Sequence, residues 1–99
     1  MKFTVRFTTE AKNDLVRLYD FLLEKDLNVA EQAIDAIYRA VKFLRHFPLS
    51  CRKATPETPW LRELLISFGN SGYVALFEID NQQTITILAF RHQHEDDYF

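Results

Sequence analysis

The spacing of apolar residues changes abruptly within this 99-residue chain, and the change limits the possible folds. Before residue 48, apolar side chains recur every three or four residues, as on a helix with one buried face. After residue 60, three segments are rich in branched and aromatic residues: LRELLISF, YVALFEI and TITILAFR. Such segments are typical of strands. The sequence therefore predicts an α+β domain whose helices precede most of its strands.

The helical part divides into two apolar stripes. One consists of Ala11, Leu15, Leu18, Tyr19 and Leu22, and the other of Ala30, Ala33, Ile34, Ile37, Val41 and Leu44. Thr8 or Thr9 is suited to cap the first helix, and Asn28 with Glu31 matches the capping box of a second. Pro48 disfavours helix in the residue before it.

These signals predict helices at Thr9–Lys25 and Val29–Phe47. The joint between them, near Leu27, is so short that the helices form an antiparallel hairpin.

An additional strand is predicted in KFTVRF, where Phe3, Val5 and Phe7 alternate with polar residues. The three later strands are separated by GNSG and DNQQ, which suit turns, and form an antiparallel meander. The predicted order is β-α-α-β-β-β, with the hairpin packed on one face of the sheet. The run Val74 to Phe77 is apolar throughout, so the other face also needs a cover, which a partner would supply.

The segment PLSCRKATPETP holds all three prolines and is predicted to be a surface loop.

Composition limits the location and the partners. With 47% apolar residues the chain suffices for one packed domain spanning residues 1–99. The formal charge of -2 leaves no cationic excess for general nucleic-acid binding. Cys51 is the only cysteine, and we find neither a signal peptide nor an apolar run of the roughly 20 residues that span a bilayer. We expect a cytoplasmic protein without a membrane partner.

Four motifs in order carry a resemblance to a known family. FTTEAKNDL opens the first helix, LRELLISF looks like the family's RELR strand, GYVALFEID stands at its YRVLYRV, and ILAFRHQHEDDY looks like ILAVRHQREDDY. The chain resembles the RelE/ParE toxins of bacterial toxin–antitoxin pairs over nearly its whole length. The resemblance implies a toxin that is neutralised by a cognate antitoxin, with which it could form an oligomer.

The family has two branches with different chemistry. RelE-like toxins are similar to ribonucleases that cut messenger RNA on the ribosome, and use an arginine at the YR motif and basic or aromatic residues near the carboxy end. ParE-like toxins lack that set and inhibit DNA gyrase. Here Val74 replaces the arginine that would stabilise the phosphate, which favours the ParE-like branch. We predict that the target is contacted by Arg91, His92, His94 and Tyr98, which would also be the catalytic set of a nuclease.

Other candidate residues carry weaker signals. His92 and His94 are two residues apart on a strand and point to one side, yet other clustered ligands are lacking, so we predict neither a metal site nor a cofactor. Phe21 and Phe43 lie off the main helical stripes, and Trp60 ends the proline-rich loop. We predict that these three aromatic residues contact the antitoxin, satellite core packing being the alternative.

Overall fold

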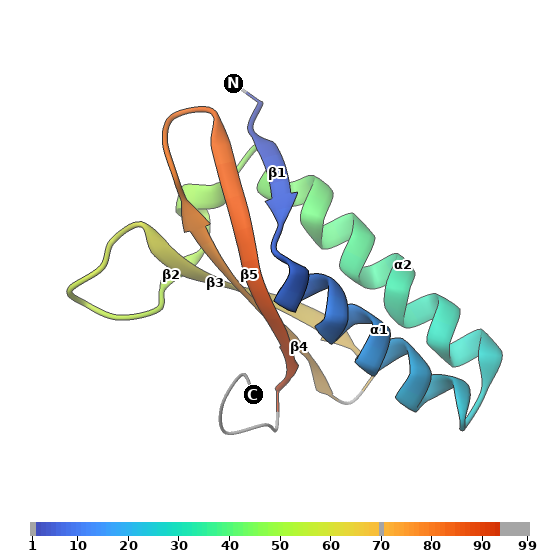
Figure 1. The fold of residues 1–99 in the computed structure, drawn as a ribbon. Helices are drawn as coiled ribbons and strands as arrows, with labels where there is room; N and C mark the ends of the chain where they lie inside the picture. The colour runs from blue at the N-terminus through green and yellow to red at the C-terminus, as the bar shows by residue number, and fades with distance from the viewer. Residues whose placement is uncertain (1, 70, 94–99) are drawn as a thin grey trace.

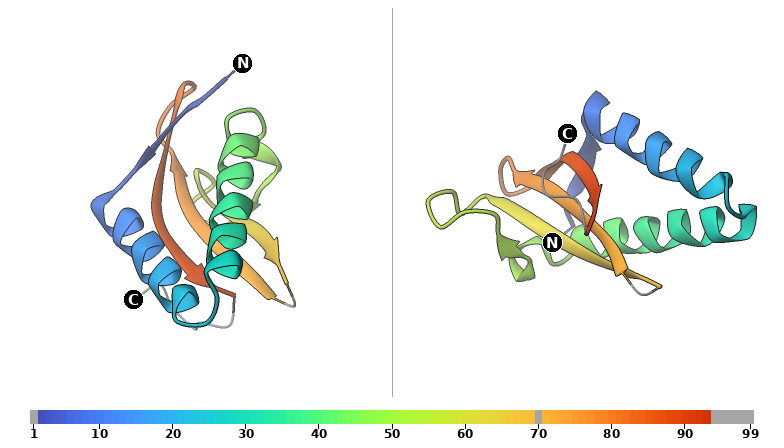
Figure 2. Two further views of the ribbon diagram at one scale, coloured as in Figure 1. Left: turned by 90° about the vertical axis from the view of Figure 1, so that its right-hand side faces the viewer. Right: turned by 90° about the horizontal axis from the view of Figure 1, so that it is seen from below.

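A computed structural model describes residues 2–69 and 71–93. The elements are β1 (Thr4–Phe7), α1 (Thr9–Leu23), α2 (Leu27–Leu44), the 3-10 helix η1 (Pro48–Ser50), β2 (Arg52–Lys53), β3 (Leu61–Phe68), β4 (Ser71–Ile79) and β5 (Thr84–His92) (Figure 1). Both helices lie on the same face of the twisted sheet, α1 over β5 and α2 over β3 (Figure 2). The predicted α+β fold with a helical hairpin on a sheet is confirmed.

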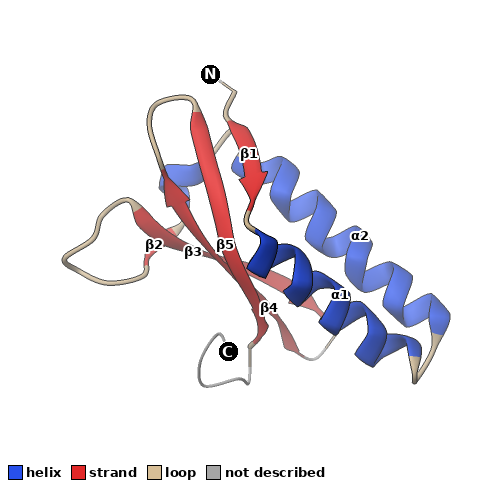
Figure 3. Cartoon of the chain, viewed as in Figure 1, coloured by secondary structure: helices blue, strands red, loops and turns tan. Residues whose placement is uncertain are grey.

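The five strands form one sheet in the order β1-β5-β4-β3-β2 (Figure 3). β3, β4 and β5 make the predicted antiparallel meander. β1 is parallel to β5, so the sheet as a whole is mixed instead of antiparallel throughout. The alternation in KFTVRF predicts which face of β1 is buried, but says nothing about the direction of its neighbour.

The helix boundaries differ from the prediction in instructive ways. Thr8 caps α1, because the Ala11 N–H donates to its Oγ1 at 3.0 Å. The second cap was predicted wrongly: α2 begins at Leu27, and the Asp26 carboxylate accepts from the N–H groups of Asn28 and Val29 at 2.7 and 3.4 Å. Asn28 lies inside the helix instead of capping it. The observed ends, Leu23 and Leu44, precede the predicted ones by two and three residues, since Pro48 sets only a latest limit for α2.

The core lies between the hairpin and the sheet. The predicted stripes are buried in α1 at Ala11 and Leu18, and in α2 at Ala30, Ala33, Ile37, Val41 and Leu44. The sheet contributes large buried side chains, among them Phe77, Phe90, Ile85 and Ile87. Phe3, Val5 and Phe7 pack against this cluster, as the alternation in β1 predicts.

The outer face of the sheet, which is the face away from the helices, is covered unevenly. Val74 and Ala89, at its centre, are each only 2% exposed, whereas Leu65 on β3 is 50% exposed. The apolar face that was expected to need an external cover is thus buried at its centre and exposed toward the β3 side.

The proline-rich loop is more ordered than its composition predicts. It contains η1 and β2, and both Pro48 and Cys51 are buried. The Arg62 guanidinium organises it by donating to the carbonyl oxygens of Leu49, Cys51 and Pro59 at 3.2, 2.7 and 2.9 Å. Such long-range contacts of an arginine leave no trace in local periodicity.

Candidate functional site

A β-bulge in β5 determines where the predicted target-binding residues point. β4 and β5 pair in register except between Leu76 and Phe77, where Leu88 is the extra residue of β5. A bulge shifts the alternation of side chains by one position. Ile85 and Ile87 face the helices before the bulge, and Phe90 does so after it. Ala89 therefore lies on the outer face.

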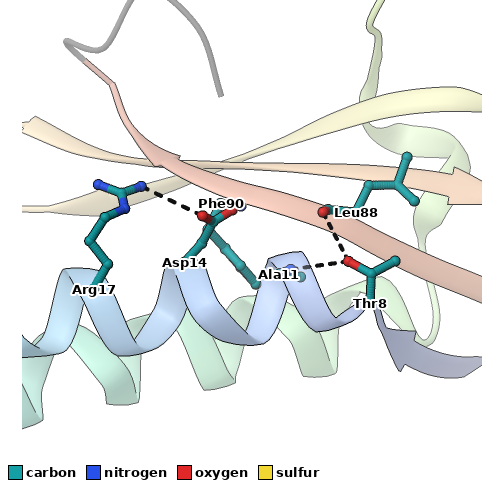
Figure 4. Close-up of polar contacts among 6 residues, drawn as sticks. All are labelled: Thr8, Ala11, Asp14, Arg17, Leu88 and Phe90. Atoms are coloured by element: carbon teal, nitrogen blue, oxygen red, sulfur yellow. Dashed lines mark hydrogen bonds and ion pairs between the residues drawn. The ribbon is translucent and has the colours of Figure 1, made fainter. Parts of the chain in front are cut away.

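Two side chains of the first helical segment hold this bulge (Figure 4). The Thr8 hydroxyl donates to the Leu88 carbonyl at 3.0 Å, and the Phe90 N–H donates to Asp14 Oδ2 at 3.0 Å. β1 pairs with β5 only as far as Ile87, so these side chains replace the missing strand neighbour. Arg17 Nη2 lies 3.8 Å from Asp14 Oδ1 and supports the carboxylate.

The hydrogen bond that Asp14 accepts from the backbone of β5 was not predicted from the sequence. A signal was available, because Asp14 lies three residues after Ala11, close to the apolar stripe of α1, where a carboxylate needs a partner.

Two of the predicted site residues lie on opposite faces of β5, and the bulge decides which face each takes. Arg91 pairs with Val74 and lies on the outer face, where its Nη1 donates to the carbonyls of His92 and Gln93 at 3.3 and 3.4 Å. His92 lies on the helix side, and its ring meets that of Tyr73 edge-on at 5.7 Å between centroids. His94 and Tyr98 lie outside the described residues. The two described members of the predicted set are therefore neighbours in sequence on opposite faces of the sheet.

Two nucleophilic groups of the described chain have perturbed pKa values. Burial raises the pKa of the Tyr73 hydroxyl above its ordinary value of 10.0. Burial also raises the pKa of the Cys51 thiol above 9.0, an effect that the nearby Arg62 guanidinium partly offsets. Both groups stay protonated near neutral pH, so neither is activated. Within residues 2–69 and 71–93 we also find no group of three His, Cys, Asp or Glu side chains that could hold a metal ion.

The three aromatic residues predicted to contact an antitoxin are exposed but do not form one patch. Phe21, Phe43 and Trp60 are 57%, 44% and 58% exposed. Phe21 lies near the joint of the hairpin under the Lys25 ammonium, 5.0 Å away. Phe43 contacts Phe47 with tilted rings, 5.3 Å between centroids, at the far end of α2, about 25 Å along the helix from that joint by the rise of an α-helix. Their role in antitoxin binding stays a prediction.

A groove between the helices offers a more continuous surface. The hairpin groove, of about 570 Å³, is lined by Leu15, Val16 and Tyr19 of α1 and by Glu31, Ile34 and Asp35 of α2. Val16 is 59% exposed there. The groove combines an apolar floor with two carboxylates.

In the described part of the chain, no helix is long and apolar enough to cross a membrane.

Comparisons with known proteins agree with the fold and the motifs. Residues 5–97 match the family model described as the ParE toxin of the type II toxin–antitoxin system parDE. The chain is 33% identical over 93 residues to Toxin RelE3 of Caulobacter vibrioides, covering 93% of this chain and 96% of the relative. It is 34% identical over 79 residues to Toxin RelE1 of the same organism, with 80% and 82% covered. A chain of the chromosomal ParDE TA system from P. aeruginosa has a similar fold, with a TM-score of 0.72, 23% identity and coverage of 92% and 96%.

Proposed function

Because the chain belongs to the ParE toxin family of type II toxin–antitoxin systems, we propose that it acts by binding and inhibiting DNA gyrase in the cytoplasm. The observation that carries this choice is the placement of Arg91 and His92 as adjacent residues in the regular part of β5, after the bulge. They therefore point to opposite faces of the sheet. A cation and an imidazole that diverge in this way do not act on one phosphate, whereas a binding surface has no such requirement.

The position of Val74 supports the same choice. Cleavage of RNA by its own 2'-hydroxyl requires a proton acceptor, a proton donor and a cation on the crowded phosphate. Val74 replaces the family's arginine and is 2% exposed beside Arg91. Loss of one such stabilising group typically costs about 3 kcal/mol in the transition state. An inhibitor loses nothing by the replacement.

A RelE-like messenger RNA endonuclease is the second candidate. It is favoured by the names of the two Caulobacter relatives, which are RelE toxins. Its catalytic residues would be Arg91, His92, His94 and Tyr98, with the two histidines in acid–base roles.

We further propose that the cognate antitoxin docks in the hairpin groove through an amphipathic helix. Leu15, Tyr19 and Ile34 offer an apolar floor, and Val16 is already exposed to a partner. Glu31 and Asp35 line the groove as carboxylates, so the docking helix is expected to carry Lys or Arg beside its apolar stripe.

The two mechanisms are separated by following expression of the full chain with transcript mapping and with a gyrase supercoiling assay. We expect inhibited supercoiling and intact messages. Arg91→Ala and His92→Ala should each weaken inhibition only several-fold, because a binding surface spreads its energy over several anchors. Lys12→Ala, an exposed cation on α1, is the matched control. Cuts at codon spacing in translated messages, abolished by changing His92 and His94 together to Ala, would establish the nuclease instead.

A further inference from the structure

β3 has an edge that is only partly paired. Its neighbour β2 lies opposite Arg62 and Glu63 alone. The carbonyl of Trp60 accepts from the Ile79 N–H on the β4 side, whereas the carbonyl of Leu61 accepts from the Ala54 N–H on the opposite side. Successive residues of a strand direct their backbone groups to alternate sides.

It follows that Leu65 and Ser67 direct their N–H and C=O groups away from β4, past the end of β2. Among the described residues no strand lies opposite them. We call the stretch Leu64–Phe68 the β3 edge.

The β3 edge lacks the features that usually block strand addition. Natural edge strands carry charges, prolines or bulges that discourage pairing with another chain. This stretch reads LLISF, without charge or proline. A recess of about 310 Å³ lies beside it, lined by Phe43, Ser50, Cys51, Arg52, Glu63, Leu64 and Leu65. Phe43 and Leu65 are 44% and 50% exposed. Unpaired backbone groups next to an apolar recess are the two requirements for binding an extended peptide.

The charges around the β3 edge indicate what kind of segment it accepts. Three cations lie on the elements that flank it, Arg39 on α2 and Arg52 and Lys53 on β2, and the recess also contains the carboxylate of Glu63. Arg52 is paired, its Nε and Nη2 each 2.9 Å from Glu63 Oε1. Arg39 lies one helical turn before Phe43, on the same side of α2, and Lys53 follows Arg52 on β2. Two copies of this chain meeting at the edge would bring like charges together, whereas an acidic segment is attracted.

We propose that the β3 edge binds an extended acidic segment of a partner protein, which adds to the sheet next to β3. The backbone of Leu65 and Ser67 supplies two donors and two acceptors. An apolar side chain of the segment enters the recess beside Phe43, and its carboxylates lie near Arg39 and Lys53. This inference concerns a surface separate from the hairpin groove, and it holds whether the toxin acts on gyrase or on RNA.

Two capped octapeptides test the proposal on the full chain, one alternating Glu with Val and the other alternating Lys with Val. We expect the Glu–Val peptide to bind and to protect the Leu65 and Ser67 amides from hydrogen exchange, measured by NMR. The Lys–Val peptide should bind at least about tenfold more weakly, because its charge matches that of the surface.

Substitutions at Ser67, whose side chain is exposed, refine the test. Ser67→Glu should weaken binding of the Glu–Val peptide and Ser67→Lys should strengthen it, in each case by several-fold. Ser67→Pro removes one donor and blocks the edge, so binding should fall at least about tenfold. Thr4→Glu, on the exposed side of β1 at the opposite end of the sheet, is the matched control and should have no effect. Circular dichroism verifies that each variant is folded.

Three results would overturn the proposal. One is binding of the Glu–Val peptide without protection of the two amides, or no binding at all. Another is equal binding of both peptides. The third is concentration-dependent protection of these amides in the free chain, which would assign the β3 edge to a second copy.

Discussion

The hairpin groove and the β3 edge differ in charge and in the type of group that they present. Residues 8–35, which form α1 and the first part of α2, include seven acidic and three basic residues: Glu10, Asp14, Asp20, Glu24, Asp26, Glu31 and Asp35, against Lys12, Arg17 and Lys25. Residues 36–56, which run from the second half of α2 to just beyond the end of β2, hold five cations and no acid, and Arg39, Arg52 and Lys53 of this segment flank the β3 edge. The groove offers side chains only, whereas the edge also offers backbone donors and acceptors.

The small net charge of -2 therefore conceals two segments of opposite charge. A helix satisfies its own backbone and can dock only through side chains, so a groove between helices selects another amphipathic helix. A strand edge is satisfied only by an extended chain. The two surfaces therefore call for partner segments that differ in both conformation and charge.

The largest expected effect is a loss of stability from a substitution in β4 that disturbs its pairing with β3. A Cβ added at Gly72, in β4, would lie 2.1 Å from the Ile66 carbonyl oxygen, which belongs to the backbone of β3. Gly72→Ala must therefore shift the strand pair, and we expect a loss of about 3 kcal/mol of unfolding free energy. Thermal unfolding should show a decrease in midpoint of at least about 12 °C.

Gly69→Ala is the control for this change. Gly69 has φ +61 and open space around its Cβ position, so alanine costs only backbone strain, about 1 kcal/mol. Equal effects of the two substitutions would contradict the close approach of β4 to β3.

The next effect concerns the connection between the hairpin and the sheet. Asp14→Ala removes the acceptor of the Phe90 N–H, and a partly buried donor without a partner costs about 2 kcal/mol. Asp14→Asn retains an oxygen acceptor and should lose less than half of that. Urea unfolding of the two variants measures the difference. If alanine and asparagine behave alike, the carboxylate does not hold the bulge in β5.

A smaller effect is expected on antitoxin affinity, and it distinguishes the hairpin groove from the rest of the hairpin. Val16→Glu places a third carboxylate in the hairpin groove, so affinity for the cognate antitoxin should fall at least about tenfold, while stability changes by less than about 0.5 kcal/mol. Tyr38→Glu is the control, since Tyr38 is an exposed apolar residue of α2 (63%) outside the groove lining. Titration calorimetry compares them, and similar losses would argue against the groove as the docking site.

The smallest expected effect is a loss of stability at alkaline pH, caused by the Cys51 thiol in the recess beside β3. The folded chain holds the Cys51 proton more tightly than the unfolded chain, because burial raises the thiol pKa above 9.0. The corresponding stability is present below pH 9 and is lost as the pH rises through the raised folded-state pKa. Between pH 8 and about 10, the urea midpoint of the natural chain should therefore fall more steeply than that of Cys51→Ala. Parallel pH curves would show that the thiol is not desolvated.

Much of the fold follows from local patterns. The apolar stripes predict both helices, and the buried residues Ala11, Leu18, Ile37 and Leu44 lie on them. The meander follows from branched residues separated by turn signals. Helix ends are less well determined, because Asp26 and Asn28 both suit a cap and only the backbone decides which side chain reaches the free N–H groups.

The candidate site was only partly predictable for a related reason. Arg91 and His92 are recognisable as polar residues at the end of a strand, and adjacent residues on a strand face opposite sides in any case. Which face each takes depends on the bulge at Leu88, and the bulge depends on Thr8 and Asp14, which are more than 70 residues away in sequence.

Local patterns specify the number and order of the main elements, the buried stripes and the membership of the family, because each depends on the period or identity of nearby residues. Long-range contacts set the parallel pairing of β1 with β5, the faces of Arg91 and His92, the loop contacts of Arg62 and the open edge of β3. These features arise where segments distant in the chain satisfy, or leave open, each other's backbone hydrogen bonds.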